Sequence, residues 1–212
     1  ASWVHRADPA AATEKAKQLV AMAVAKARLL RPITRPTLQV EPSVLVIGGG
    51  AAGMTAALAV ADQGFDAYLV EREPVLGGHL RHVRGSLGRG DPQDLLRTLT
   101  ARIEAHPRVS VYKSAEVTEV GGYVGKFETT LRLGDGSKTQ VSHGAVIVAT
   151  GGQAVRPKEY LYGDDPRVIL QTDLEERLAA REVQARQVVM IQCVGSRDEV
   201  RPYCSRFCCG QA

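Results

Sequence analysis

Residues 43–53 read SVLVIGGGAAG, and this stretch decides the fold. Its first five residues, Ser43–Ile47, are almost all Val, Leu or Ile, which predicts a short parallel strand that is buried on both faces. Small residues then fill 51–63 and indicate a helix, and 65–70 is a second apolar run that predicts another strand. The sequence therefore predicts a strand–helix–strand unit over residues 43–71, with a glycine-rich turn between its first strand and its helix.

The glycine-rich turn has the pattern G-x-G-x-x-G at Gly48, Gly50 and Gly53. A side chain is excluded at Gly48 by a tight turn, at Gly50 by the close approach of phosphate to the backbone, and at Gly53 by tight packing of the helix on the strand. Ala52 lies in the first helical turn, whose free N–H groups and positive dipole end attract a pyrophosphate. Glu71, 18 residues beyond Gly53, ends the second strand and can accept hydrogen bonds from ribose hydroxyls, so a dinucleotide is expected. The alternative is a glycine-rich turn that binds no ligand.

Three further segments favour FAD over NAD as that dinucleotide. Arg72 and then Leu76-Gly77-Gly78-His79 follow Glu71 as in flavoproteins, where a Gly-Gly loop lies against the phosphates and the ribityl chain. Residues 115–143 alternate apolar and polar residues between glycine turns, which predicts an inserted antiparallel meander. The end of a later strand, Ala149-Thr150-Gly151, resembles the second flavoprotein motif. Beyond the three glycines, Ala52 and Glu71, the expected FAD-binding residues are Arg72, Gly78, His79, Val117, Ala149, Thr150 and Gly151.

The other elements complete an α/β fold. Asp8 and Pro9 suit the N-cap and the first position of an alanine-rich helix over 9–30, and prolines make 31–42 a linker. We also expect a helix at 91–105, strands at 109–112, 145–149 and 188–191, and a helix over 172–181 that starts with a Thr172–Glu175 capping box. Three parts follow: an N-terminal helix and linker (1–42), a Rossmann-like FAD-binding domain with a parallel sheet and the inserted meander (43–152), and the start of a second, degenerate dinucleotide-type domain (153–212).

Composition and charge exclude several classes of function. The chain has 212 residues, a net charge of +4 and no block of Lys or Arg, so a nucleic-acid partner is not expected. No run of 18 apolar residues occurs, so no membrane span is expected, and the lack of a signal-like N-terminus predicts a cytoplasmic protein. The chain begins with Ala1 and ends three residues after Cys209, as expected for a segment of a longer protein.

All four cysteines lie in the last 20 residues, with the spacing Cys193-x10-Cys204-x3-Cys208-Cys209. Structural disulfides are disfavoured in a reducing compartment. Four thiolates suit zinc, but the paired knuckles usual for structural zinc are missing, and four thiolates also hold iron–sulfur clusters. The cluster is favoured because a flavin can divide a two-electron input into one-electron steps. Arg197, Arg201 and Arg206 flank the cysteines, where guanidinium groups would raise the reduction potential of an anionic cluster.

The cysteine motif resembles that of one family. Cys193-Val194-Gly195-Ser196-Arg197 and Tyr203-Cys204-Ser205-Arg206-Phe207-Cys208-Cys209, with Ser2-Trp3-Val4-His5 ahead of the first helix, are similar to the A subunit of heterodisulfide reductase and its bacterial relatives. The resemblance implies a thioredoxin-reductase-like FAD domain whose flavin is the site of electron bifurcation. It implies a nearby [4Fe-4S] cluster held by Cys193, Cys204, Cys208 and Cys209. It also implies a cytoplasmic complex with B- and C-type iron–sulfur subunits and with a hydrogenase or another electron-donor subunit.

The chain departs from many members of that family. They carry inserted ferredoxin-type cysteine runs after the first strand–helix–strand unit, whereas residues 72–143 here contain no cysteine. A cysteine commonly precedes their Ser-Trp-Val-His run, and this chain has Ala1 there.

Two rival functions remain open. A pyridine-nucleotide-linked flavoprotein disulfide reductase should show a redox-active Cys-x-x-Cys, which this sequence lacks. Such a reductase would also carry a second glycine motif, for NAD(P)H, directly after the strand at 188–191. This sequence has Gln192-Cys193-Val194-Gly195-Ser196 at that place, so no NAD(P)H site is predicted in this segment. The other rival is a scaffold subunit that keeps FAD only as a structural element. No catalytic acid or base is assigned, although His79 and His82 follow Gly78 in the same loop.

Overall fold

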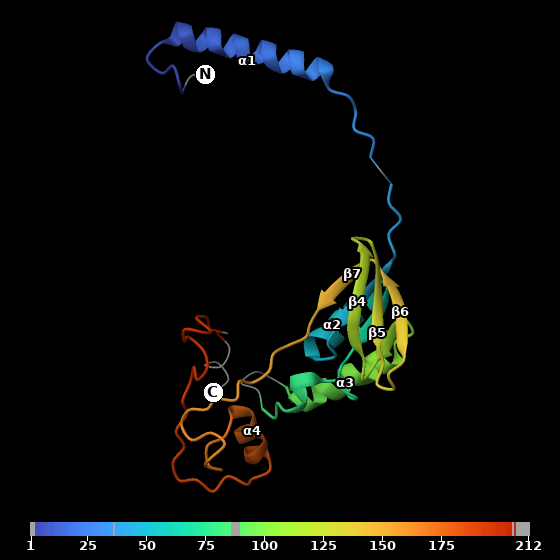
Figure 1. Ribbon diagram of the computed structural model, residues 1–212, viewed down its shortest axis with the longest axis vertical. Helices are drawn as coiled ribbons and strands as arrows, with labels where there is room; N and C mark the ends of the chain where they lie inside the picture. Colours follow the sequence, from blue (N-terminus) through green and yellow to red (C-terminus); the bar gives the residue numbers. More distant parts are fainter. Residues whose placement is uncertain (1–2, 36, 86–89, 205, 207–212) are drawn as a thin grey trace. The chain divides into compact units, whose positions relative to one another are not determined.

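The computed structural model describes residues 3–35, 37–85, 90–204 and 206, and the chain divides into two units, Ala1–Leu38 and Gln39–Ala212. The first unit contains helix α1 (Pro9–Leu29), drawn in blue in Figure 1. The Asp8 side chain accepts a hydrogen bond from Ala11 N at 3.0 Å and Pro9 opens the first turn, which confirms the predicted start of this helix. None of the helices in the described ranges is long and apolar enough to cross a bilayer.

A four-stranded parallel sheet organises the second unit. Its strands are β1 (Ser43–Ile47), β2 (Asp66–Val70), β3 (Val109–Tyr112) and β7 (Ala145–Val148), in the order β3-β2-β1-β7. Helix α2 (Ala51–Asp62) connects β1 to β2, and α3 (Pro92–Ala105) leads into β3. Because all three strand pairs are parallel, the carboxyl ends of β1, β2 and β7 meet at one edge, which is where ligands bind in sheets of this kind.

An antiparallel meander is inserted between β3 and β7. Its strands are β4 (Glu116–Tyr123), β5 (Lys126–Arg132) and β6 (Lys138–His143), in that order. Gly122 has a φ of +91° near the end of β4, where a Cβ would overlap the carbonyl oxygen of Lys126. The predicted fold class, an α/β domain with a parallel sheet, an inserted meander and a preceding helix, is confirmed.

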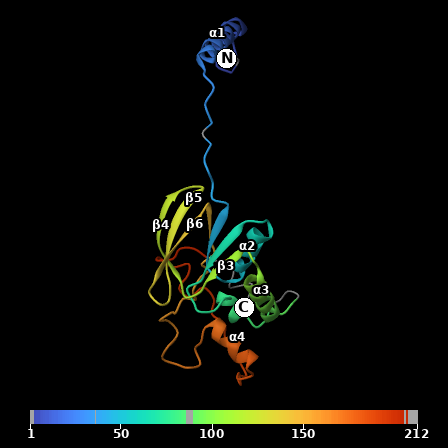
Figure 2. The same cartoon turned by 90° about the vertical axis from the view of Figure 1, so that its right-hand side faces the viewer.

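The parallel sheet buries side chains on both faces. Figure 2 shows α2 and α3 on one side of it and the meander on the other. The cluster under the helices includes Val46, Met54, Leu69 and Ile103. The cluster under the meander includes Leu45, Val70, Leu131 and Val141. Neighbouring residues of one strand therefore face opposite clusters, which explains why the strand sequences are apolar throughout instead of alternating.

Residues 153–206 contain one helix within their described part, α4 (Gln171–Ala179), and two predictions for this region are wrong. The helix begins at Gln171, so Asp173 takes the third helical position and accepts a hydrogen bond from Leu170 N at 3.2 Å, in place of the predicted Thr172–Glu175 box. The predicted strand at 188–191 does not form. Val189 is 83% exposed, and no strand of the described chain pairs with this run to satisfy its backbone groups.

Candidate functional site

The turn after β1 packs against the end of β7, and two of its glycines leave no room for a side chain. Gly48 has a φ of +109°, and its N–H donates to Val70 O at 2.8 Å. A Cβ on Gly48 would overlap the carbonyl oxygen of Ala149, and a Cβ on Gly53 would overlap that of Gly48. At Gly50, by contrast, a Cβ would meet no atom within 4 Å. Gly48 and Gly53 therefore close the turn, while Gly50 leaves space open at the N-terminus of α2.

Glu71 is tied to this turn from the end of β2. Its side chain is buried, Oε2 accepts from Gly49 N at 2.7 Å, and Oε1 accepts from Glu73 N at 2.8 Å. Each carboxylate oxygen has a second lone pair, so Glu71 keeps the capacity to accept from a ribose hydroxyl. Sequence reasoning missed Gly49, where a Cβ would lie 2.6 Å from Leu76 Cδ2 and 2.9 Å from Glu71 Oε2. The available signal was that Gly49 lies between Gly48 and Gly50 in an unbroken run of three glycines.

The second glycine pair, Gly77-Gly78, lies alongside the first turn. Gly77 N donates to Gly49 O at 2.8 Å, and Gly50 and Gly77 form an isolated parallel bridge. A Cβ on Gly78 would lie 3.2 Å from Gly50 Cα. Both glycine segments therefore border the same space. Gly78 also opens a short 3₁₀ turn, η1 (Gly78–Arg81), within the predicted loop, and the His79 side chain in this turn is exposed.

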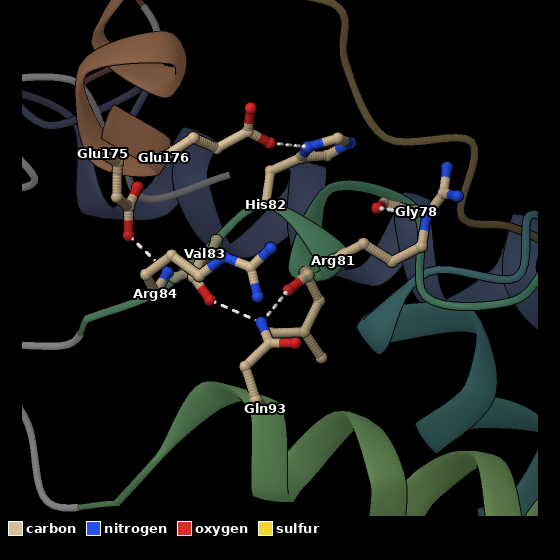
Figure 3. Close-up of polar contacts among 9 residues, drawn as sticks. Gly78, Arg81, His82, Val83, Arg84, Gln93, Glu175 and Glu176 are labelled. Carbon is tan, nitrogen blue, oxygen red and sulfur yellow. Dashed lines mark hydrogen bonds and ion pairs between the residues drawn. The ribbon is translucent and has the colours of Figure 1, made fainter. Parts of the chain in front are cut away.

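A glutamine from α3 holds the segment that follows Gly78 (Figure 3). Gln93 Nε2 donates to Leu80 O at 3.1 Å and to Val83 O at 2.7 Å. These two carbonyl groups belong to irregular backbone, so the amide supplies hydrogen bonds that no neighbouring strand provides. Nothing in the residue type of Gln93 signals this role in the sequence.

Two glutamates of α4 contact the same segment. Glu175 Oε1 accepts from Arg84 N at 2.6 Å and from Gly85 N at 3.1 Å, and Glu176 Oε1 lies 2.6 Å from His82 Nδ1. A carboxylate can only accept, so His82 Nδ1 carries the proton of this contact. The hydrogen bond from His82 lowers the pKa of Glu176. Sequence reasoning missed these contacts because they join residues about 90 positions apart.

The segment Ala149-Thr150-Gly151, which resembles the second flavoprotein motif, contacts the glycine turn through Ala149. Ala149 N donates to Ile47 O at 2.8 Å, which holds the end of β7 against the glycine turn. Thr150 and Gly151 follow as exposed backbone, and Gly151 has a φ of +68°. The motif predicted from the sequence is thus adjacent to the first one in space.

The remaining predicted residues differ in their positions. Ala52 is exposed in the first turn of α2, at the open side of the glycine turn. Arg72 is exposed beside Glu73, with 3.7 Å between Nε and Oε1. Val117 lies in β4 in register with Leu131, and it packs against the core cluster under the meander.

These residues fit a bound dinucleotide. Gly50 is the N-cap of α2 and supplies no side-chain acceptor to the first N–H groups of the helix. Those donors and the positive end of the helix dipole face the space that a side chain at position 50 would fill, so a phosphate finds partners there. Glu71 and Gly78 border the same space with a carboxylate and a backbone without a side chain.

The cysteines lie in a separate segment, partly outside the described residues. Cys193 is half-buried with a φ of +64°, and Cys204 is exposed and accepts a hydrogen bond from Arg206 N at 3.3 Å. Cys208 and Cys209 lie outside the described residues. Among the residues that are described, no three His, Cys, Asp or Glu side chains gather as metal ligands.

The loop between Cys193 and Cys204 is closed by local contacts. Ser196 Oγ donates to Tyr203 O at 2.8 Å, and Arg197 N donates to the same oxygen at 3.2 Å. Arg201 Nη1 donates to Gly195 O at 3.3 Å. Arg197 and Arg201 are therefore part of this loop, whereas Arg206 follows it and is bonded through its backbone to Cys204.

Residues 42–194 match the family described as pyridine nucleotide-disulphide oxidoreductase. The chain belongs to this family. The match covers the parallel sheet, the meander and α4 and ends just beyond Cys193. Together with the relatives described next, it confirms that the chain carries an oxidoreductase domain of the FAD-binding type.

Two curated relatives agree with the predicted resemblance. The A subunit of the H(2):CoB-CoM heterodisulfide,ferredoxin reductase of Methanothermobacter thermautotrophicus is 31% identical, over 98% of this chain and 46% of the relative. One of the iron-sulfur A subunits of the CoB--CoM heterodisulfide reductase of Methanopyrus kandleri is 32% identical over the same shares. The chain thus spans about half the length of the curated relatives it matches. The alignments extend over 305 and 301 positions, more than this chain has residues, so the relatives contain segments that it lacks.

One solved structure supports the fold. The L-proline dehydrogenase from P. horikoshii superposes with a TM-score of 0.51 over 73% of this chain and 31% of that chain, at 22% sequence identity. At this identity the likeness concerns the fold alone.

Proposed function

We propose that this chain binds FAD and a [4Fe-4S] cluster in a heterodisulfide-reductase-like subunit, where the flavin divides electron pairs into single electrons for the cluster. The observation that supports this most is the open space at Gly50, bordered by the N-terminus of α2, Glu71 and Gly78. The four cysteines follow in the same chain. The relatives are named as A subunits of heterodisulfide reductases, and one of the names includes iron–sulfur.

In this proposal the pyrophosphate of FAD takes the space at Gly50, and Glu71 accepts hydrogen bonds from the ribose. Gly49 N and Glu73 N hold the Glu71 carboxylate in place before the ligand arrives. When bound, FAD supplies a group that accepts electrons in pairs and releases them singly. The proposed FAD-binding residues are those expected from the sequence: Gly48, Gly50, Ala52, Gly53, Glu71, Arg72, Gly78, His79, Val117, Ala149, Thr150 and Gly151.

The proposed cluster ligands are Cys193, Cys204, Cys208 and Cys209. When bound, the cluster supplies a carrier of single electrons. The hydrogen bond from Arg206 N to Cys204 Sγ would raise its reduction potential, as would the positive charges of Arg197, Arg201 and Arg206.

The proposed partners come from the family. We assign the full protein to a cytoplasmic complex with B- and C-type iron–sulfur subunits and with a hydrogenase or another donor. The name of the Methanothermobacter relative, which includes H(2), ferredoxin and the word subunit, supports such partners. We also propose the division into 1–42, 43–152 and 153–212, since the parallel sheet ends with β7 at Val148 and the motif Ala149-Thr150-Gly151 follows directly.

The test is anaerobic purification of the full-length protein and of its Cys193→Ser variant, with flavin and iron quantified. We expect about one FAD per chain in both proteins, and about four fewer iron atoms per chain in the variant. Equal iron contents would contradict the cluster ligands. A wild-type protein that retains no FAD would contradict the whole proposal.

An NADH titration separates this proposal from a pyridine-nucleotide-linked disulfide reductase. The segment Gln192–Ser196 stands where a second glycine loop would bind the pyrophosphate of NAD(P)H. We therefore expect no rapid bleaching of the flavin band when NADH is added to the isolated, folded protein. Rapid bleaching at stoichiometric NADH would favour the reductase.

A further inference from the structure

Arg81 is a half-buried residue whose side chain lies against the second glycine segment. Its Nε donates to Gly78 O at 3.3 Å, and its stem covers Gly77, where a Cβ would lie 2.8 Å from Arg81 Cγ. Figure 3 shows the side chain reaching back along the loop to Gly78. Gly78 is in turn next to Gly50, with a Cβ on Gly78 only 3.2 Å from Gly50 Cα. The guanidinium is thus held next to Gly78, the residue of the second glycine segment that lies against Gly50.

The segment around Arg81 is fixed from outside. The Gln93 amide donates to Leu80 O and to Val83 O, one on each side of Arg81 in the sequence. Gln93 belongs to α3, whose Leu99 and Ile103 lie in the core, so it anchors the loop to a packed helix. A side chain on such a segment loses little freedom when it binds a ligand, which favours affinity.

The groups described so far around the open space include no full positive charge that could bind an anion, and Arg81 could supply one. The Glu71 carboxylate adds a negative charge next to Gly49, and α2 offers an anion only the partial charge of its N-terminus. Arg72 is exposed and near Glu73. Within the described part of the chain, no carboxylate lies within salt-bridge distance of Arg81. A half-buried arginine whose guanidinium has no carboxylate partner among the described residues suits an anionic ligand.

We propose that Arg81 binds the pyrophosphate of FAD through its two Nη groups while its Nε keeps the hydrogen bond to Gly78 O. The proposal rests on the proposed FAD site and adds to it a charged residue that the glycine motifs do not include. The guanidinium fork matches phosphate oxygens in geometry and charge. If Arg81 merely covered Gly77, its removal would weaken ligands with and without phosphates equally.

The experiment measures dissociation constants for the full-length protein after anaerobic removal of its flavin. FAD, ADP and adenosine are titrated into wild type, Arg81→Met and Arg81→Lys. Arg84→Met is the matched control, because it removes the same charge from an exposed side chain three residues further along the same loop. For Arg81→Met we expect FAD and ADP to bind about 10- to 100-fold more weakly, with adenosine changed less than about twofold. Arg81→Lys should recover part of the loss, and Arg84→Met should match wild type.

Three outcomes would overturn the proposal. Equal weakening of ADP and adenosine by Arg81→Met would assign Arg81 a structural role only. Unchanged ADP binding would also reject the contact, while tight FAD binding by the wild type would leave the proposed function intact. A wild type that binds neither FAD nor ADP would instead reject the proposed function, and the Arg81 contact with it. Circular dichroism of each variant shows whether it has folded.

Discussion

Two regions of this chain are built in different ways. In the glycine-turn region (residues 43–85 and 145–151), the key hydrogen bonds join Gly48 to Val70, Gly49 to Glu71 and Gly77 to Gly49, all far apart in sequence. In the cysteine segment (residues 188–206), the hydrogen bonds between described residues join positions at most seven apart, such as Ser196 and Tyr203. The comparison indicates that the fold itself forms the proposed nucleotide site, whereas we expect a bound ligand to organise the cysteine segment.

Gly53→Val is expected to have the largest effect and to break the glycine-turn region. Any side chain there would overlap the Gly48 carbonyl, so we expect a loss of about 3 kcal/mol or more in the free energy of unfolding. Gly50→Ala is the matched control, because its Cβ meets no atom within 4 Å. It should fold normally yet bind FAD about tenfold more weakly, since the methyl group enters the phosphate space. Thermal unfolding and FAD content check both variants, and wild-type stability in Gly53→Val would contradict this reading of the turn.

Cys204→Ser tests whether the cysteine segment is independent of the nucleotide site. The residue is exposed, and its one hydrogen bond in the described structure comes from Arg206 N. We expect the variant to lose the cluster iron, while the FAD content and the unfolding midpoint of the FAD domain change little, by less than about 2 °C. Tyr203→Phe is the control, because it keeps the thiolates. Loss of FAD together with iron in Cys204→Ser would mean that the two regions depend on one another.

Glu71→Gln is expected to have a moderate effect within the glycine-turn region. Glutamine has one acceptor oxygen, so its amide N–H₂ would face a backbone N–H of either Gly49 or Glu73 inside a buried site. We expect a loss of about 2 kcal/mol in unfolding free energy and about tenfold weaker FAD binding. The control is Glu73→Gln, which changes an exposed side chain and should shift stability by less than about 0.5 kcal/mol. Denaturant titrations of both variants decide, and equal losses would contradict the role of Glu71.

The smallest expected effect is a pH dependence of the free energy of unfolding, and it comes from His143. Its ring is fully buried against Phe127, Nδ1 donates to Ala145 O at 3.0 Å, and Nε2 lies 2.7 Å from Thr129 Oγ1. Burial lowers the pKa of His143 below its usual value, with the hydrogen bond to Ala145 O acting in the opposite direction. As the pH falls, the unfolded chain therefore takes up a proton at His143 before the folded chain does. The contribution of His143 to the free energy of unfolding is fully present above about pH 6.5, and it decreases as the pH falls below that value.

The measurement is denaturant unfolding at about pH 7.5 and about pH 5.5. We expect the wild type to lose more unfolding free energy on going to the lower pH than His143→Gln, which does not titrate in this range. Identical losses in the two proteins would show that His143 does not carry the pH dependence.

Much of the fold could be predicted because its signals are local. The run Ser43–Ile47, the glycine spacing and the small residues of 51–63 specify β1, the turn and α2 without knowledge of the rest. The strand predicted at 188–191 failed for the opposite reason. An apolar run indicates burial, but a parallel strand also needs a neighbour, and a single segment does not show whether one is present.

The candidate site was predictable where a motif describes a backbone constraint. The roles of Gly48 and Gly53 follow from close packing, and the structure places both glycines against carbonyl groups. The hydrogen bonds of Gln93 and of Glu175 were not predictable, because any polar residue on a helix surface looks the same in the sequence. Their partners are set by how the loop folds back, which is a property of the whole domain.

In the proposed function, FAD and the cysteines serve one path for electrons. The most direct test is a stepwise anaerobic reduction of the full-length protein, monitored by flavin absorbance and EPR, in wild type and Cys193→Ser. We expect bleaching of the flavin band in both proteins, and in the wild type the EPR signal of one reduced [4Fe-4S] cluster that the variant lacks. The same EPR signals in both proteins, or a wild-type flavin that no one-electron donor reduces, would contradict the account.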